Sequence, residues 1–148
     1  MPQLFLPLWD FIRVRDGNEL AASIANRHYS RIWKGNINQN RLCGNGERVI
    51  LVHPLGNWVF VWNKQKYRKD GQEGVNCVLF RNESSILSSQ IILMCEKYWN
   101  DHFGMDRKFT YVHPRLVKSS NPGYCFQKAG WVKSGLSKKG LILLVKDA

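Results

Sequence analysis

Apolar residues recur along the chain at two spacings, one typical of helices and the other of strands. Positions 20, 21, 24 and 25 are apolar, so we expect a helix over Asn18–Arg31. A longer stripe, at 87, 91, 94, 95 and 98, predicts a helix over Ser84–His102. A short helix is expected after the Asn-Pro-Gly turn at 121–123. It should end at Gly130 before Trp131, because glycine tolerates the positive φ found just past a helix.

Runs rich in β-branched and aromatic residues predict strands between these helices. We expect a hairpin formed by Arg48–His53 and Trp58–Trp62, joined by a Pro-Leu-Gly-Asn turn at 54–57. Two further strands are expected over Val75–Phe80 and Lys108–His113, and a last hairpin over 131–146 that turns near 135–140. The apolar segment Leu4–Ile12 is interpreted as a first strand or a packing arm.

The order of these elements is helix, hairpin, strand, long helix, strand, short helix and hairpin. Strands combined with helices that flank them indicate an α+β (mixed α/β) fold. A chain of 148 residues is long enough to bury a core and suits one domain, 1–148. We therefore predict one domain with a central, mostly antiparallel sheet flanked by helices.

Three aromatic residues of one predicted strand share a face, because side chains alternate along a strand. They are Trp58, Phe60 and Trp62. We favour a core face for them over the alternative, an exposed platform on which bases of a single-stranded nucleic acid stack.

The charge of the chain predicts a polyanionic partner, since 22 Lys and Arg against 11 Asp and Glu give a net charge of +11. Such cations bind phosphates of double-stranded DNA, although a solvated loop is the default for a charge run. Two sets of cations are predicted to bind nucleic acid: Lys64, Lys66, Arg68 and Lys69 in a loop over 63–74, and Lys133, Lys138 and Lys139 in the last hairpin.

The four cysteines, at 43, 77, 95 and 125, form no Cys-x-x-Cys pair, which favours a reduced, cytoplasmic protein. The four histidines are scattered and have no ligand spacing with a cysteine, so no metal site is predicted. No apolar run approaches the ~20 residues that span a bilayer, so no membrane partner is expected.

The predicted turn between the strand Val75–Phe80 and the long helix has the composition of an anion site. Backbone N–H groups at a helix start attract anions, and Ser84 and Ser85 add hydroxyl donors. Arg81 could clamp a phosphate or carboxylate with two hydrogen bonds. The alternative is that the serines only cap the helix.

The segment Asn121–Trp131, read as aromatic-x-Lys-x-Gly-aromatic, resembles the end of the fold in GNAT-type N-acyltransferases. The order of the preceding elements is similar as well. The resemblance implies that the strands Val75–Phe80 and Lys108–His113 lie side by side and then splay, leaving a cleft for an acyl thioester. It implies acetyl-CoA or another acyl or glycyl donor, held by Phe80, Arg81, Asn82, Ser84, Ser85 and Asn121. The family's pyrophosphate turn contains glycines, whereas the turn here has none.

Four patches together resemble the narrower family of bacteriophage Mom proteins. They are His28–Ser30, Phe80–Ser84, Phe109–His113 and Asn121–Trp131. Mom proteins are GNAT-related enzymes that convert the exocyclic amine of adenine in phage DNA to a carbamoylmethyl derivative, which protects the DNA from restriction. The resemblance implies a DNA-modifying transferase that acts in the cytoplasm of a bacterial host.

Roles for individual residues follow from that resemblance. Tyr29 and Tyr124 would stack on or hydrogen-bond an adenine flipped out of the duplex. Arg81 would hold the anionic part of the donor. His113, which stands where the family has an aspartate, would relay a proton near neutral pH. Phe126 stands where many GNAT enzymes have a tyrosine, and a phenyl ring has no proton to donate.

Two other functions fit the sequence. One is a conventional acetyl-CoA-dependent N-acyltransferase acting on a small amine, a peptide or an already modified base. The other is a non-catalytic nucleic-acid-binding module that uses the aromatic face at 58–62 and the cations at 64–69. The identity of the donor, the DNA sequence context, the oligomeric state and any need for a metal or host factor stay open.

Overall fold

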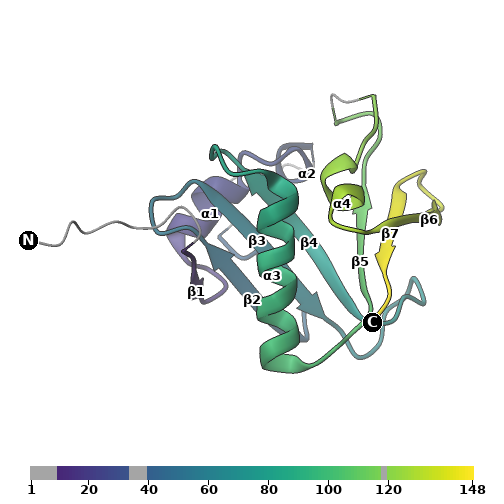
Figure 1. Ribbon diagram of the computed structural model, residues 1–148, viewed down its shortest axis with the longest axis horizontal. Helices are drawn as coiled ribbons and strands as arrows, with labels where there is room; N and C mark the ends of the chain where they lie inside the picture. Colours follow the sequence, from purple (N-terminus) through teal and green to yellow (C-terminus); the bar gives the residue numbers. More distant parts are fainter. Residues whose placement is uncertain (1–9, 34–39, 118–119) are drawn as a thin grey trace, which may run out of the picture.

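The computed structural model describes residues 10–33, 40–117 and 120–148 (Figure 1). These residues form seven strands and four helices: β1 (Ile12–Val14), α1 (Glu19–Ala25), α2 (Tyr29–Trp33), β2 (Glu47–Val52), β3 (Trp58–Lys64), β4 (Val75–Asn82), α3 (Ser88–Phe103), β5 (Lys108–Val112), α4 (Tyr124–Lys128), β6 (Val132–Leu136) and β7 (Ile142–Lys146). None of the described helices has the length and apolar character needed to cross a membrane.

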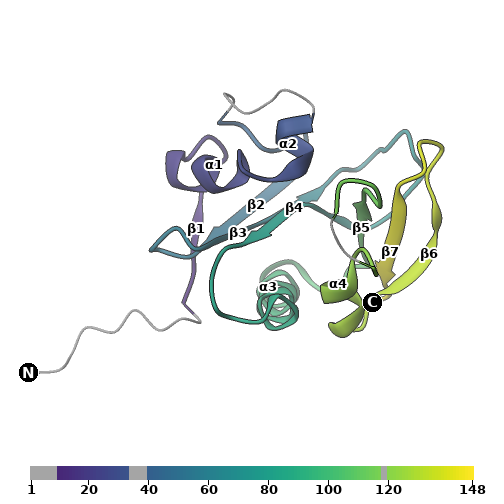
Figure 2. The same ribbon diagram turned by 90° about the horizontal axis from the view of Figure 1, so that it is seen from above.

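The strands form one open sheet in the order β1-β2-β3-β4-β5-β7-β6. Neighbouring strands are antiparallel except for β4 and β5, which are parallel. Helices α1 and α2 cover one face of the sheet, and α3 and α4 cover the other (Figure 2). The predicted α+β fold with a mostly antiparallel sheet is therefore confirmed.

The aromatic face of β3 belongs to the core between the sheet and α3. Trp58, Phe60 and Trp62 are fully buried, and the indole N–H of Trp62 donates to the Cys95 carbonyl at 3.0 Å. The preferred interpretation of this face as core is confirmed. A stacking platform at these three side chains is excluded, because bases cannot reach them.

The predicted helix over Asn18–Arg31 is wrong in its second half, because two helices form with a turn between them. Asn18 caps α1 by accepting from the Ala21 N–H at 3.1 Å. The chain then turns, and the Nδ1 of His28 accepts from the Ser30 N–H at 3.1 Å. An imidazole therefore takes the role that a short polar side chain usually has at a helix start.

The long helix begins later than predicted, at Ser88 instead of Ser84. Asn82 is the reason, since its Oδ1 accepts from both the N–H and the Oγ of Ser84, at 2.8 and 2.6 Å. This closes a local turn that competes with helix formation. Leu87 then occupies the N-cap position, and its side chain makes no capping hydrogen bond.

Other predicted bounds shift by a few residues. Arg81 and Asn82 belong to the end of β4 and not to a turn, and Lys64 belongs to β3 and not to the loop. His113 lies just past β5. Most of Leu4–Ile12 lies outside the described residues, and β1 pairs with β2 from Ile12 onward. The predicted last hairpin and the short helix before it are confirmed.

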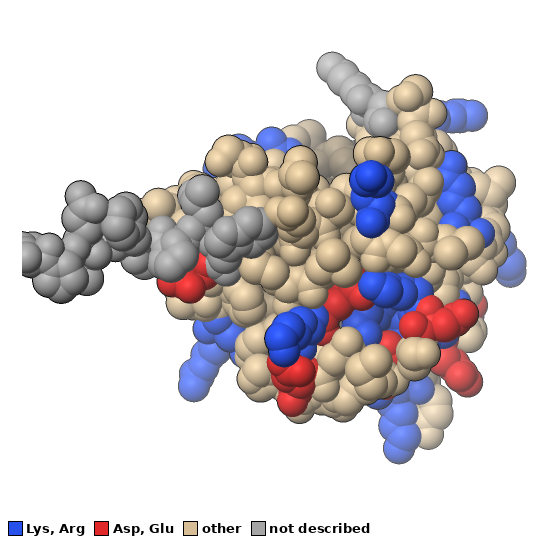
Figure 3. Space-filling model, in the orientation of Figure 1, with Lys and Arg blue, Asp and Glu red and all other residues tan. Residues whose placement is uncertain are grey.

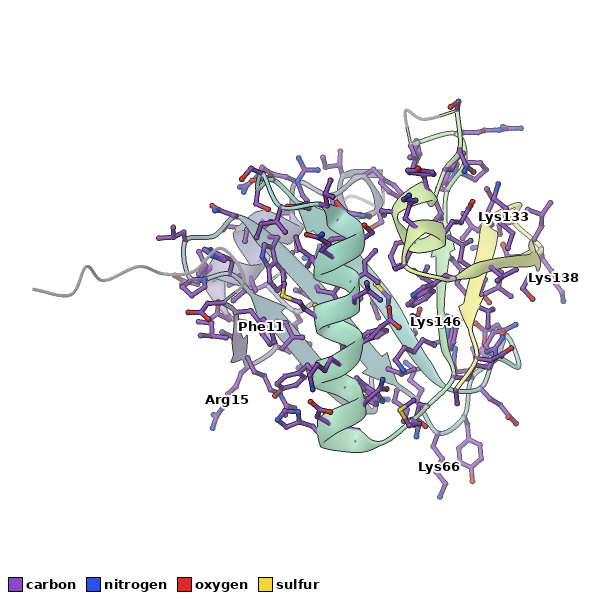
Figure 4. All side chains as sticks on the ribbon, in the orientation of Figure 1. Phe11, Arg15, Lys66, Lys133, Lys138 and Lys146 are labelled. Atoms are coloured by element: carbon purple, nitrogen blue, oxygen red, sulfur yellow. The ribbon has the colours of Figure 1, made fainter. Side chains whose placement is uncertain are left out.

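A buried ion pair joins α3 to the last hairpin. Glu96 on α3 is 5% exposed, and its carboxylate lies 2.7 Å from the Nζ of Lys146 on β7. It also accepts from the indole N–H of Trp131 at 3.2 Å, and Lys146 donates to the Ala129 carbonyl at 2.8 Å. Figure 4 shows Lys146 beside α3. These contacts fix α4 and its C-terminal turn on the α3 face.

The parallel pair β4–β5 starts at a close contact between two backbones. The Val75 N–H donates to the Arg107 carbonyl at 2.8 Å, and Gly74 immediately before it has a φ of +104°. A Cβ at residue 74 would overlap the Arg107 carbonyl. Glycine is therefore required there for both its conformation and its size.

We predict that Gly74→Ala destabilises the protein more than Gly71→Ala. Gly71 also has positive φ, +73°, but a Cβ there meets nothing within 4 Å. Gly71→Ala should cost about 1 kcal/mol from backbone conformation alone. Gly74→Ala should cost about 1–3 kcal/mol more, because the strands must shift. Urea unfolding of both variants measures the difference, and equal costs would contradict the close contact.

Candidate functional site

A cleft opens between β4 and β5 because their pairing stops early. The two strands pair only at Val75–Lys108, Asn76–Phe109 and Cys77–Thr110, although β4 continues to Asn82. Val78, the next residue of β4, is skipped in the pairing with β3, where Val61 faces Leu79 and Trp62 faces Cys77. Such a bulge bends a strand and increases its twist. The bend takes β4 away from β5 at the level of Val78.

Two inner cavities occupy this cleft. One, of about 160 Å³, lies between the strands and has walls from both faces of the sheet, His28 and Tyr29 on one side and Cys125 and Phe126 on the other. The second, of about 220 Å³, lies on the α2 side. Its lining includes Ser30, Asn76, Tyr111 and His113, and it shares Tyr29, Cys77, Val78 and Tyr111 with the first. The two cavities therefore adjoin.

An outer groove of about 850 Å³ lies next to the second inner cavity. It shares Tyr111 and Leu141 with the second inner cavity. Its rim carries Lys69 from the loop after β3, and Lys138 and Lys139 from the β6–β7 turn. The two predicted basic sets, about 70 residues apart in the sequence, therefore each supply lysines to the same groove.

Tyr29 and His113 meet at the inner end of the cleft. The backbone N–H of His113 donates to the Tyr29 hydroxyl at 3.3 Å, and both residues line the 220 Å³ cavity. Burial raises the pKa of Tyr29, so the phenol stays protonated at neutral pH. The Nδ1 of His113 accepts from the Arg115 N–H at 3.2 Å. Two of the four predicted catalytic residues are thus brought together.

His28 packs against Tyr29, with ring centroids 4.2 Å apart. Burial, and secondarily the positive charge of Arg81, lowers the pKa of His28 to about 4. The ring is therefore neutral at pH 7, and its Nδ1 already accepts from Ser30. The tautomer that fits carries its proton on Nε2, which leaves the ring as a hydrogen-bond donor in the 160 Å³ cavity.

Arg81 forms an ion pair with Glu83. Its Nε donates to Glu83 at 2.7 Å, and Arg27, in the turn after α1, donates twice to the same carboxylate, each bond 2.7 Å long. Hydrogen bonds from Arg27, and then from Arg81, lower the pKa of Glu83 to about 2. Arg81 lines none of the cavities of the cleft or the groove. The cluster instead joins the turn after α1 to the end of β4.

Of the residues predicted to bind the donor, one lines the inner cleft and others shape the turn between β4 and α3. Phe80 lines the 160 Å³ cavity and packs edge-on against Phe126. The side-chain amide of Asn82 donates to the Ile86 carbonyl at 2.7 Å and to the Ser88 hydroxyl at 3.0 Å, in addition to its bonds with Ser84. These bonds define the path from β4 to α3.

Two other predicted donor-binding residues lie outside the cleft lining. Ser85 is exposed in the turn between Ser84 and α3. The amide of Asn121 pairs with the amide of Gln127, at 3.1 and 3.3 Å. This pair ties the Asn-Pro-Gly turn to α4 and stabilises the wall of the cleft that α4 provides.

The second predicted tyrosine lies away from the cleft. Tyr124 is exposed at the start of α4 and contacts Lys128, whose Nζ is 6.0 Å from the ring centroid. Its neighbour Cys125 lines the 160 Å³ cavity, where burial raises the pKa of the thiol. A thiol of raised pKa is a poor nucleophile at neutral pH.

Several predicted nucleic-acid-binding cations have partners within the protein. Lys64 pairs with Asp106 at 2.8 Å. Arg68 pairs with Asp70 at 2.7 Å and lies 4.9 Å from the centroid of the Phe109 ring. Lys66 lies 5.6 Å from the exposed ring of Tyr67. Arg68 is therefore mainly structural, whereas Lys69 lies on the rim of the groove.

The remaining predicted cations project from the last hairpin. Lys133 is exposed on β6, and Lys138 and Lys139 are exposed in the turn that follows (Figure 4). On the face that carries α3, the upper middle of the molecule is mainly uncharged, acidic and basic side chains lie together in the lower middle, and further basic side chains lie along the side of β6 (Figure 3). The positive charge is therefore unevenly distributed.

Three residues of the cleft were not identified from the sequence. Ser30, Asn76 and Tyr111 line the 220 Å³ cavity, and the hydroxyl of Tyr111 donates to Asp70 at 3.1 Å. The sequence contained one indication of Asn76, because this residue interrupts an apolar strand and asparagine is depleted in strands. Among the described residues, no cluster of three or more His, Cys, Asp or Glu side chains is placed to hold a metal ion.

We predict that the free energy of unfolding falls as the pH drops from about 6.5 to about 4 because of His28. In this window the unfolded chain binds a proton at residue 28 that the folded chain does not bind, which favours unfolding by about 2–3 kcal/mol in total. His28→Asn keeps an acceptor for the Ser30 N–H but does not titrate. Urea unfolding between pH 7.5 and 4 should show the smaller slope for the variant. The same slope in both proteins would contradict the neutral, buried imidazole.

Comparisons with models of known protein families, with curated proteins and with solved structures found no match to this chain. The function is therefore inferred from the residues of the chain and from their arrangement.

Proposed function

We propose that the chain is a GNAT-like transferase that modifies the exocyclic amine of adenine in DNA, as Mom proteins do. The observation that carries the proposal is a cleft between two parallel central strands that opens into a groove with lysines on its rim. The cleft suits a group transfer shielded from water, and the lysines suit a phosphate backbone. The proposed polyanion-binding surface therefore adjoins the proposed reaction site.

Positioning is the main requirement of such a reaction, because the adenine amine is a weak nucleophile whose lone pair is delocalised into the ring. Holding it against an activated donor supplies much of the rate. The inner cavities, of about 220 and 160 Å³, are smaller than the ~300–1,000 Å³ of sites for drug-sized ligands. They suit one flipped base and a small transferred group, with the sugar and phosphates in the outer groove.

Proton transfer is the second requirement, since the amine loses a proton as the new N–C bond forms. The bond between the transferred group and the rest of the donor breaks in the same transfer, and with an acyl thioester the thiolate leaves with the electron pair. The imidazole of His113 lines the cavity beside Tyr29 and is the proposed acceptor, with its Nδ1 exchanging the hydrogen bond from the Arg115 N–H for the proton, directly or through water. The neutral ring of His28 is a proposed donor toward the carbonyl of the transferred group. Tyr29 would orient the base between them.

The donor is proposed to enter from the opposite face of the sheet. The 160 Å³ cavity reaches that face between Phe80 and the α4 residues Cys125 and Phe126. Acetyl-CoA or another acyl or glycyl donor would place its reactive carbon there. The turn before α3 has no glycine, so a pyrophosphate would bind less closely to the backbone than in the GNAT pattern.

We predict that cells expressing the chain contain a modified adenine nucleoside, detectable by mass spectrometry of digested DNA. Tyr29→Phe should lower its yield on the order of 10²-fold, because the hydroxyl near His113 is lost. Tyr124→Phe is the matched control and should keep the yield near that of the wild type, since Tyr124 lies outside the cleft.

Two results would contradict this proposal. Only ordinary nucleosides and methylation in DNA from cells that express folded protein would exclude adenine modification. Turnover of simple amines with acetyl-CoA, with no requirement for DNA, would indicate the conventional N-acyltransferase instead.

We predict that Lys69, Lys138 and Lys139 contribute to DNA binding through phosphate contacts. Replacing all three with Gln should reduce the slope of log K against log[salt] by about 2–3, since each phosphate contact contributes about 0.9. The control is Lys97→Gln, which replaces an exposed lysine of α3 and should leave the slope unchanged. Fluorescence anisotropy with duplex DNA at several salt concentrations measures the slopes. An unchanged slope in the triple variant would place the DNA elsewhere.

A further inference from the structure

Asn76 is a polar residue in the interior of β4 whose side chain is incompletely hydrogen-bonded. It lies between the buried residues Val75 and Cys77 and lines the 220 Å³ cavity. Its Oδ1 is buried and accepts no hydrogen bond from the residues that the structure describes. A buried carbonyl oxygen without a donor destabilises a protein, so this position is not optimised for stability.

A neighbouring asparagine, Asn63, has a structural role in this sheet and serves as a comparison. Asn63 faces Asn76 across the β3–β4 pairing and is also buried. Its side-chain amide donates to the carbonyls of Asn45 and Glu47, at 3.1 and 3.0 Å. Asn63 therefore stabilises the backbone around it, whereas the oxygen of Asn76 has no such function.

The cavity around Asn76 has the chemistry of a site for a flat heterocycle. Tyr29 and Tyr111 provide aromatic walls, and Ser30 and His113 add polar groups. Asp70 anchors the hydroxyl of Tyr111 at 3.1 Å, which fixes that ring. Aromatic side chains bind any base by stacking, so they do not select one. Selection requires a group with both a donor and an acceptor, and a carboxamide has both.

We propose that Asn76 determines the specificity of the cleft by binding a base that carries an exocyclic amine next to a ring nitrogen. The carboxamide oxygen accepts from the amine, and the carboxamide N–H₂ donates to the ring nitrogen. Adenine and cytosine both have this edge on their Watson–Crick face, whereas thymine and guanine have a carbonyl at the corresponding carbon and a protonated ring nitrogen beside it. The amine of guanine is at C2, between N1–H and N3. The inference rests on the proposed function, and it names the residue that selects the base.

The test measures binding and does not depend on turnover. The probes are oligothymidylates that carry one central dA, one central dC, or one purine nucleotide that lacks the exocyclic amine. Wild-type protein should bind the dA or the dC probe about 5- to 150-fold more tightly than the amine-free probe, the range for one good pair of hydrogen bonds. Comparing dA with dC shows which of the two bases the cleft accepts.

Asn76→Leu is the main variant, because leucine has a similar size but makes no hydrogen bond. It should bind all three probes equally, while its Tm stays unchanged or rises because an unpaired polar group is removed. Asn63→Leu is the matched control. It should keep the wild-type preference and lose about 3–10 °C in Tm, because two backbone carbonyls lose their donor.

Retained discrimination in Asn76→Leu, or no discrimination in the wild type, would overturn the proposal. If Asn76→Leu fails to fold, Asn76→Thr gives the same test with a residue that strands favour. Discrimination that depends on Asn76, in a protein that leaves cellular DNA unmodified, would support this inference and reject the proposed reaction. The experiments can therefore reject the role of Asn76 and the proposed adenine modification independently of each other.

Discussion

The short parallel pairing of β4 and β5 is the constraint on which the cleft depends. At its start the two backbones are in contact, which only a glycine at position 74 permits. Four residues after Gly74, the bulge at Val78 bends β4 away from its partner. Pairing at one end and separation at the other create a wedge-shaped space inside an otherwise continuous sheet. A longer ladder would fill that space with backbone hydrogen bonds and leave no site.

Separated strands must be supported, since an open sheet centre would otherwise expose apolar surface. The α4 side does this with Phe126 and Trp131, which pack against each other at 4.9 Å between ring centroids and reach Phe80 and Trp62 respectively. The buried Glu96 fixes Trp131 and the last hairpin in this position. Rigid walls on that side allow the α2 side to present polar groups to the cavity.

Charged side chains and the neutral polar side chains of the cleft lie in different parts of this arrangement. Lysines lie at the rim of the outer groove, whereas the inner cleft holds neutral polar side chains, including an imidazole that burial keeps uncharged. Arg68 is paired with Asp70, and Arg81 shares the Glu83 carboxylate with Arg27, so both arginines are held by a carboxylate outside the cleft. Under the proposed function, a polyanion would therefore bind at the outer groove and present only a neutral part to the inner cleft.

Periodicity predicted most of the elements, because burial on one face imposes spacing directly on the sequence. It failed where side chains compete with the backbone. The Asn82 turn delays α3, and His28 starts a second helix where a continuous one was expected. The sequence also indicated the basic sets, but it could not distinguish lysines free to bind a ligand from arginines held by a neighbouring carboxylate.

The sequence by itself determined the α+β class, the aromatic core strand, the final hairpin and the excess of positive charge. Only the tertiary structure decided where the cleft opens and which residues meet in it. Tyr29, Asn76 and His113 come from three separate elements, and no spacing along the chain relates them. Their proximity depends on one bulge and on how far two strands pair, which are properties of the assembled sheet and not of any local segment.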